Sequence, residues 1–188
     1  SGATATALGT ALAAAVNADT GLPVTASATD GVVTLTARHK GLVGNGIDVR
    51  TNYYQGERTP KGLTVAVVQP TGGTLNPDIQ AAITAVGDEQ YHTVISPYTD
   101  ASNLNALEAM LANRWGPMLQ TEGHAYTAAS GTHASLITLG NSRNSPHVTI
   151  MGAGKSPTPA YVWAAVAGAV DAFERSEERR VGKECRSR

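Results

Sequence analysis

Hydrophobic residues near the start of the chain follow first a helical and then a strand-like period. An alanine-rich stretch, 3–18, has Leu8, Leu12 and Val16 at helical spacing and predicts a helix. Three runs follow in which apolar and polar residues alternate, which is typical of strands. These runs are 22–28, 32–38 and 47–54. Asp30-Gly31 separates the first two and predicts a β-hairpin. The first 62 residues therefore predict a small subdomain of one helix and a mainly antiparallel sheet.

From residue 63 onward, apolar runs typical of buried strands alternate with segments of helical period. The predicted strands are 63–69, 91–96, 124–130 and 147–152. The predicted helices are 77–86, 100–115, 132–140 and 159–173. In the second of these helices Asp100 is the expected N-cap, and Leu104, Leu107 and Leu111 are expected to face inward. Four strands alternating with four helices predict an α/β domain, with a mainly parallel sheet and right-handed crossovers, over residues 63–174.

The last 14 residues, 175–188, break with this pattern. They read RSEERRVGKECRSR and hold six of the 14 Lys and Arg residues of the chain. So few apolar residues cannot form a core, which predicts a disordered tail. The sequence of this tail also resembles read-through from a cloning vector, so we interpret the tail as non-native. A natural basic interaction tail is the other interpretation.

Composition excludes several classes of protein. A hydrophobic content of 41% is enough for a core, and a net charge of −1 gives no electrostatic case for binding nucleic acid. Cys185 is the only cysteine, which excludes an internal disulfide and a cysteine-based zinc site. No apolar run approaches the ~20 residues of a membrane-spanning helix. The first residues lack the basic start of a signal peptide.

One stretch, VTIMGAGKSPTP at 148–159, begins as a strand and continues into GAGKS, which resembles the end of a phosphate-binding loop. A P-loop reads G-x-x-x-x-G-K-[ST], and Thr149 occupies the position of its first glycine. A β-branched residue disfavours the positive φ that such loops use. In a P-loop, the Lys and Ser/Thr open a helix whose amide groups face the phosphates. Pro157 biases Ser156 away from the helical region and removes an amide donor, so it argues against such a helix start.

The same stretch is therefore interpreted as a strand, a glycine turn and the start of a helix. The helix is expected to begin at Pro159, with Thr158 as its N-cap. A nucleotide-binding or hydrolase α/β enzyme that uses the loop Gly152–Ser156 remains the alternative function.

Serine and histidine residues do not form a recognisable catalytic motif. G-x-S-x-G is absent, and GTHAS at 131–135 has His133 where a subtilisin-like motif has its serine. The other candidates are Ser130 and Ser135 as nucleophiles and His92, His124 and His147 as bases. No spacing ties them into a triad. The histidines show no H-x-x-x-H or H-E-x-x-H, and Asp88-Glu89 is interpreted as a solvated turn. We assign no catalytic residue, no cofactor and no metal ligand.

Four stretches together resemble the contractile tail sheath proteins of tailed phages, especially the Mu-like branch. They are LPVTASATDGVVTLTARHKGLVGNGIDVR, GGTLNPDIQAAITAVGDEQYHTVISPYTD, NRWGPMLQTEGHAY and GTHASLITLGNSRNSPHVTIMG. The resemblance runs in consistent order over residues 3–174 and implies the subtilisin-like α/β domain of these proteins. The family's role needs no catalytic residues, which agrees with His133 at the serine position.

The resemblance implies a structural subunit that polymerises around a tail tube and contracts to drive the tube through the host envelope. The implied partners are other sheath subunits, the tail tube protein, and the baseplate and tail terminator proteins. The implied location is the virion tail, and the host cytoplasm during assembly. Family members join neighbours by terminal arms that add strands to each other's sheets. This chain resembles an internal fragment without those arms, so we expect it to fold without forming sheaths by itself.

Overall fold

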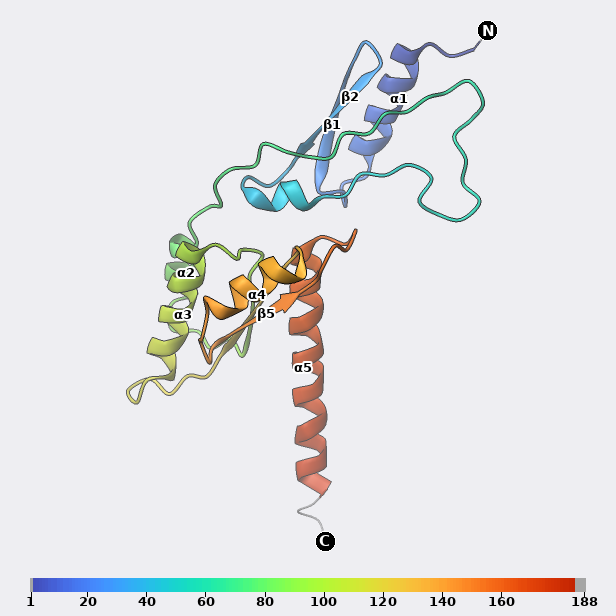
Figure 1. Cartoon of the computed structure of the whole chain (residues 1–188). Coiled ribbons are helices and arrows are strands. Elements are labelled where there is room, and N and C mark those ends of the chain that lie inside the picture. The colour runs from blue at the N-terminus through green and yellow to red at the C-terminus, as the bar shows by residue number, and fades with distance from the viewer. Residues whose placement is uncertain (1, 185–188) are drawn as a thin grey trace. The chain divides into compact units, whose positions relative to one another are not determined.

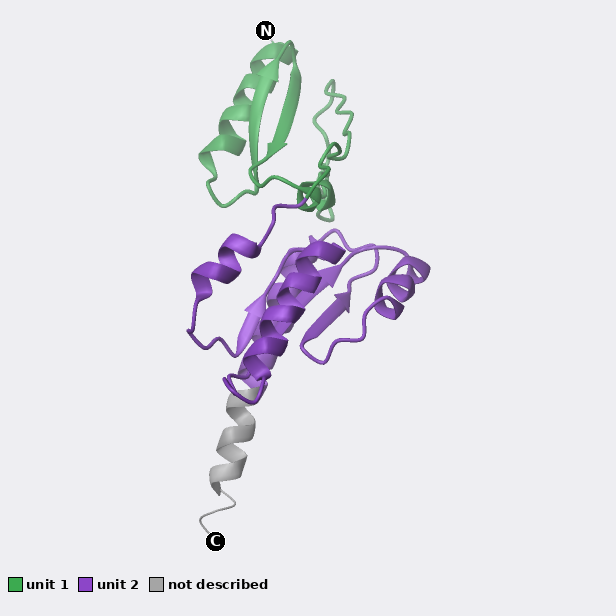
Figure 2. Cartoon of the chain, turned by 90° about the vertical axis from the view of Figure 1, so that its left-hand side faces the viewer, with its two compact units in different colours: residues 1–75 green, residues 76–188 purple. Residues whose placement is uncertain are grey.

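The structure is a computed structural model that describes the backbone of residues 2–184 and the side chains of residues 2–174. Figure 2 shows its two compact units, residues 1–75 and residues 76–188. The first unit combines a helix with an antiparallel strand pair, and the second is an α/β unit with a parallel sheet. The predicted fold class is therefore confirmed.

The boundary between the units falls after Leu75, whereas the sequence analysis placed it after Gly62. The predicted three-part division into 1–62, 63–174 and 175–188 stays a prediction. Its last part, the disordered tail, lies outside the residues whose side chains the structure describes.

The first unit begins with a helix and a β-hairpin. Its elements are α1 (Ala5–Ala18), β1 (Val24–Thr29), β2 (Val32–Ala37) and the short 3-10 helix η1 (Leu42–Gly46). The Thr4 side chain caps α1 by accepting a hydrogen bond from the Ala7 amide. The hairpin turns at Asp30 and Gly31, whose φ angles of 49° and 82° suit the two-residue turn of a twisted hairpin. The predicted hairpin is confirmed.

Small residues, and not the leucines, face the hairpin from α1. Gly9 and Ala13 are the buried residues of the helix. A Cβ placed on Gly9 would lie 3.3 Å from the Cα of Gly31, so glycine allows the helix to approach the turn closely. Leu8 and Leu12 remain 42% and 54% exposed.

Two predicted strands do not form: residues 47–54 and 63–69 contain no strand in the structure. Among the described residues, the two segments are joined by hydrogen bonds from the amide side chain of Gln69. It accepts from the Val49 N–H at 3.0 Å and donates to the Val49 carbonyl at 2.8 Å. The Gln69 side chain bonds the two backbone groups of Val49 that a neighbouring strand would otherwise bond, so no strand ladder forms here. The apolar side chains of the predicted strand 63–69 are exposed, and that of Val68 is 87% exposed.

The same contact recurs elsewhere in the first unit. Three amide side chains each bond both backbone groups of one residue: Asn17 with Ala26, Asn45 with Gly73, and Gln69 with Val49. We call these contacts amide clamps. Each one satisfies an N–H and a C=O that a neighbouring strand would otherwise bond.

The second unit contains a three-stranded parallel sheet in the order β3-β4-β5. Its elements are α2 (Gln80–Val86), β3 (Thr93–Ile95), α3 (Ala101–Trp115), β4 (His124–Ala129), α4 (His133–Asn141), β5 (Val148–Gly152) and α5 (Ala160–Glu184). The sequence analysis expected a fourth strand at 63–69, and that expectation is wrong because this segment bonds through Gln69 as described above. The other three strands lie where they were predicted.

Helices cover both faces of this sheet (Figure 1). On one face, α3 buries Leu107 and Leu111 against Ala125 of β4, with Val94 and Val148 packed beside them. Leu136 of α4 contacts Gly152, which shares the face of Val148 on β5. The predicted inward face of α3 is confirmed.

The opposite face of the sheet packs against α5. A Cβ on Gly168 would lie only 2.8 Å from Cγ1 of Ile95 and 3.3 Å from Cγ2 of Thr93. Ala164 of the same helix is completely buried. Small residues therefore let α5 lie directly on β3 and β4.

Candidate functional site

The glycine-rich loop after β5 is fixed to the end of β4. The Ala153 N–H donates to the Ala129 carbonyl at 2.9 Å, and the Gly131 N–H donates to the Gly154 carbonyl at 3.1 Å. Gly154 has a φ of 55°, a conformation that favours glycine. This loop leads from β5 to α5, and its two hydrogen bonds hold it against the end of β4.

Lys155 and Ser156 do not open a helix, as a P-loop requires, because α5 begins only at Ala160. The Ser156 hydroxyl instead accepts hydrogen bonds from the Thr158 N–H at 3.1 Å and from Nε1 of Trp163 at 3.3 Å. It thereby orders the entry to α5. The helix begins one residue later than the predicted Pro159, because the Pro159 carbonyl is the first to accept from the helical turn.

The predicted serine candidates lie at the end of β4 and the start of α4. Thr132 caps α4 by accepting from the Ser135 N–H at 3.3 Å, and the Ser135 hydroxyl donates back to the Thr132 carbonyl at 2.8 Å. Ser130 and His133 are exposed on either side of this cap. The hydroxyl of Ser135 therefore serves the start of the helix.

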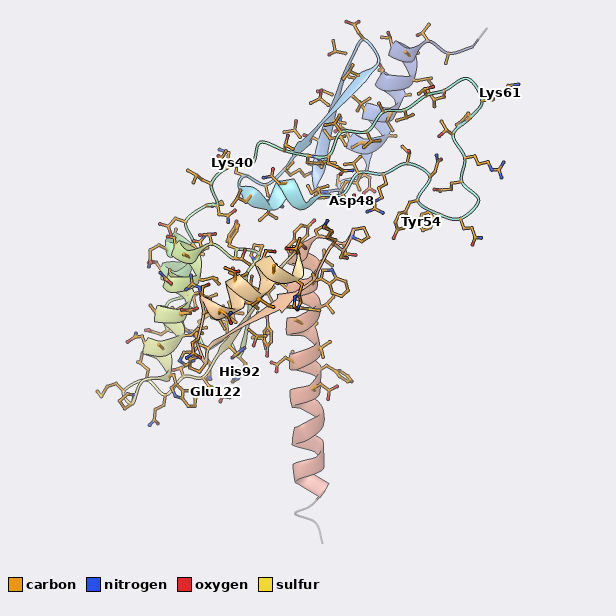
Figure 3. The ribbon with its side chains drawn as sticks, viewed as in Figure 1. Lys40, Asp48, Tyr54, Lys61, His92 and Glu122 are labelled. Carbon is orange, nitrogen blue, oxygen red and sulfur yellow. The ribbon has the colours of Figure 1, made fainter. Side chains whose placement is uncertain are left out.

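Two of the three predicted histidine bases, His92 and His124, have ring contacts with groups other than these serines. Nδ1 of His92 lies 3.6 Å from Oε1 of Glu122, and both side chains are about half exposed (Figure 3). Nε2 of His124 is 2.8 Å from Oγ1 of Thr149 across β4 and β5. For His147, the backbone N–H donates to Oγ of Ser145 at 3.3 Å in the turn before β5. These contacts order strands and turns.

Asp100 is the N-cap of α3, as predicted, and accepts from the Asn103 N–H at 3.1 Å. Asn76 and the Asn103 side chain also donate to its carboxylate. Partial burial would raise the pKa of Asp100. The hydrogen bonds from Asn76 and Asn103 outweigh it and hold the pKa below its ordinary value. The charge of Asp100 is thus used to stabilise a helix start.

Among the described residues, no group of three or more His, Cys, Asp or Glu side chains is placed to hold a metal ion. No helix within this part of the chain has both the length and the apolar content to cross a membrane. Beside the predicted Asp88-Glu89 turn, the Tyr91 hydroxyl donates to Glu89 at 2.6 Å, and this bond raises the pKa of Tyr91.

A shallow groove of about 480 Å³ lies between α3 and residues 144–147. Nη1 of Arg143 donates to Asn105 at 2.5 Å and lies 3.6 Å from Oε2 of Glu108 at this groove. The sequence analysis did not single out these residues, because an ordinary surface helix also carries Asn and Glu at such spacing.

The outer face of α5 carries an apolar stripe that the sequence analysis also missed. Its members are Val162, Val166, Val170 and Phe173, which are 36%, 43%, 55% and 62% exposed. Their spacing of four, four and three residues puts them on one side of the helix, away from buried Ala164 and Gly168. That spacing was visible in the sequence. A contiguous exposed apolar surface of this kind is typical of a protein contact.

Two comparisons with known proteins bear on this chain. Residues 72–177, more than half of the chain, match the family model described as the phage tail sheath protein central domain. The chain is also 41% identical over 170 residues to the Mu-like prophage FluMu tail sheath protein of Haemophilus influenzae. This alignment covers 90% of the chain and 35% of the relative, so the chain spans about a third of that protein's length. The chain belongs to the phage tail sheath protein family, whose members are structural proteins.

Proposed function

We propose that this chain forms part of a subunit that polymerises around a phage tail tube and contracts to drive the tube through the host envelope. The observation that carries the proposal is the 41% identity to a protein named as a tail sheath protein. Because the chain spans about a third of that protein, polymerisation and contraction are proposed for the whole protein.

The surface of the chain supports an assembling protein. The apolar stripe of α5 is exposed over three turns, and the sheet of the second unit ends in β3 and β5. Apolar faces and sheet edges are surfaces through which subunits associate. The hydroxyls of Ser135 and Ser156 are bonded at the starts of α4 and α5.

Such a subunit stores energy in its packing against neighbours. Contraction is then the conversion of one set of interfaces into another, and it requires no nucleotide. The proposed partners are other sheath subunits, the tail tube protein, the baseplate and the tail terminator. The proposed location is the virion tail, with assembly in the host cytoplasm.

The chain is expected to co-sediment with polymers of its Haemophilus relative, because the two proteins are 41% identical over 170 residues. Val166→Lys should reduce the bound fraction at least fivefold, since it places a charge in the α5 stripe. Ala172→Lys adds the same charge to an exposed position outside the stripe and serves as the control. Pelleting followed by electron microscopy measures the bound fraction. A wild-type chain that stays entirely in the supernatant would contradict the proposal.

The enzymatic alternative makes a different prediction at Lys155. We expect no saturable binding of a fluorescent ATP analogue, because Lys155 and Ser156 precede the helix instead of opening it. Fluorescence titration of the wild type and of Lys155→Ala should give superimposable curves. Binding that disappears in Lys155→Ala would restore the nucleotide-binding interpretation.

A further inference from the structure

We propose that an exposed apolar surface of the second unit binds a loop of the first unit from another copy of the chain. The surface, called here the end surface, consists of Tyr91, Trp115, Met118 and Leu119. The loop comprises residues 52–61 and is called the tyrosine loop, because it contains Tyr53 and Tyr54. The inference rests on the proposed function, since it names one contact through which copies of the chain would polymerise.

The end surface is exposed although its residues are large and apolar. Tyr91, Trp115, Met118 and Leu119 are 45%, 60%, 93% and 53% exposed. The Arg114 guanidinium donates to the Glu89 carbonyl, and the Tyr91 hydroxyl donates to the Glu89 carboxylate. These bonds hold the end of α3 against the segment before β3, so the four residues belong to one surface. A surface of this kind is typical of a protein contact.

Acidic side chains surround the end surface. Asp88, Glu89 and Glu122 are exposed, and the Gln90 amide donates to the Glu122 carbonyl at 3.2 Å, which holds Glu122 beside the other two. His92 lies 3.6 Å from Glu122, and the nearby Arg114 is bonded to backbone carbonyls (Figure 3). The second unit, counted to residue 174, contains eight Asp and Glu but only three Lys and Arg. The end surface therefore suits a partner that is both aromatic and basic.

The tyrosine loop has both properties. Tyr53 and Tyr54 are 58% and 70% exposed, and their rings meet edge to face with centroids 5.2 Å apart. Arg58 and Lys61 are also exposed, and neither side chain forms an ion pair or a hydrogen bond with a residue that the structure describes. Figure 3 shows Tyr54 and Lys61 on the same long loop. The aromatic rings and the unpaired cations match the apolar residues and carboxylates of the end surface.

Hydrogen bonds order the tyrosine loop before it meets a partner. The Asn52 side chain donates to Oγ1 of Thr59 at 2.8 Å and closes the loop. Within it, the Glu57 N–H donates to the Tyr54 carbonyl at 3.1 Å, and the Tyr54 N–H donates to the Glu57 carboxylate at 3.1 Å. An ordered loop loses less conformational entropy on binding than a flexible one, which favours docking.

The course of the chain favours a loop from a second copy over the chain's own loop. The chain enters the second unit beside the start of α3, where Asn76 donates to Asp100. The end surface lies at the other end of this 15-residue helix, about 20 Å away. Only residues 74–75 connect Asn76 to Gly73, which Asn45 holds within the first unit. The chain's own loop would have to fold back along α3, whereas a second copy meets the end surface directly.

Reversing the charges on each side tests the contact in the full chain. The loop variant carries Arg58→Glu and Lys61→Glu, and the surface variant carries Asp88→Lys and Glu122→Lys. In sedimentation velocity the wild type should associate, and each variant alone should associate at least tenfold more weakly, because like charges then face each other. An equimolar mixture should restore association, because each loop meets an end surface of opposite charge on the other variant. Such a contact joins unlike surfaces and can continue head to tail.

Lys40→Glu combined with Lys155→Glu is the matched control, since it changes the net charge equally at two exposed positions outside the contact. It should associate within twofold of the wild type. Circular dichroism of all variants should match the wild type, because every substituted residue is exposed. A control as weak as the loop variant, or a mixture that associates no better than its components, would overturn the contact.

Carbodiimide cross-linking identifies the residues that touch. The reagent joins an amine directly to a carboxylate, so Lys61 should be linked to Asp88, Glu89 or Glu122. In a mixture of unlabelled and isotope-labelled wild-type chains, mass spectrometry should find these links between the two kinds of chain. Links confined to single chains would overturn the second copy as the source of the loop.

The proposed function is decided separately. A wild-type chain that never associates with itself overturns this inference alone, because co-sedimentation with the polymers of the Haemophilus relative does not require self-association. Loss of that co-sedimentation contradicts the proposed function.

Discussion

Replacing Leu104 by alanine is expected to lower the free energy of unfolding of the second unit by about 3–4 kcal/mol. Leu104 is completely buried on α3, so its removal leaves a cavity in addition to the lost transfer energy. Urea denaturation followed by circular dichroism measures the change, with the midpoint and the slope reported separately.

Met118→Ala is the matched control for this experiment, because its side chain is 93% exposed. It should change the free energy of unfolding by less than about 0.5 kcal/mol. If Leu104→Ala cost no more than Met118→Ala, α3 would not pack on the sheet as described.

Asn103→Ala is expected to cost the same unit about 2–3 kcal/mol. The Asn103 side chain is 3% exposed, accepts from the Ile79 N–H at 3.1 Å and donates to the Pro77 carbonyl at 2.9 Å. Alanine would leave both backbone groups without their partner and remove one of the hydrogen bonds to Asp100.

Asn113→Ala, at an exposed position of the same helix, controls for the change in helix propensity. Thermal unfolding of both variants gives the difference. An Asn103→Ala protein as stable as Asn113→Ala would show that the segment before α2 does not depend on this amide.

Local signals in the sequence were sufficient for several elements. Asp30-Gly31 specified the hairpin, and Leu104, Leu107 and Leu111 specified the inward face of α3, because turn residues and helical spacing act over a few positions. The proline after GAGKS likewise argued correctly against a P-loop, since the helix does not begin at Lys155.

Features that depend on distant partners could not be predicted in this way. Residues 63–69 have the composition of a buried strand, yet a strand also needs a neighbour, and Gln69 bonds Val49 instead. The predicted start of α2 at Pro77 is wrong for a similar reason. Asn103, 26 residues further on, holds the Pro77 carbonyl, and the helix begins only at Gln80.

The buried face of α1 could not be predicted from hydrophobicity, because it is formed by small residues. Leu8 and Leu12 helped to predict the helix, but Gly9 and Ala13 form its buried face, because the helix approaches the hairpin turn too closely for larger side chains. Leu8 and Leu12 remain partly exposed because the hairpin packs against the small residues instead.

Gly168 has a mechanical consequence. Helix α5 meets β3 with no side chain of its own in between, because even a methyl group there would lie 2.8 Å from Ile95. Contacts this close have little compressibility, so a push on the helix displaces the sheet without first being absorbed by rotating side chains. In the contracting lattice that we propose, the helix and its sheet would therefore move together as one stiff unit, and strain would concentrate at the interfaces between subunits.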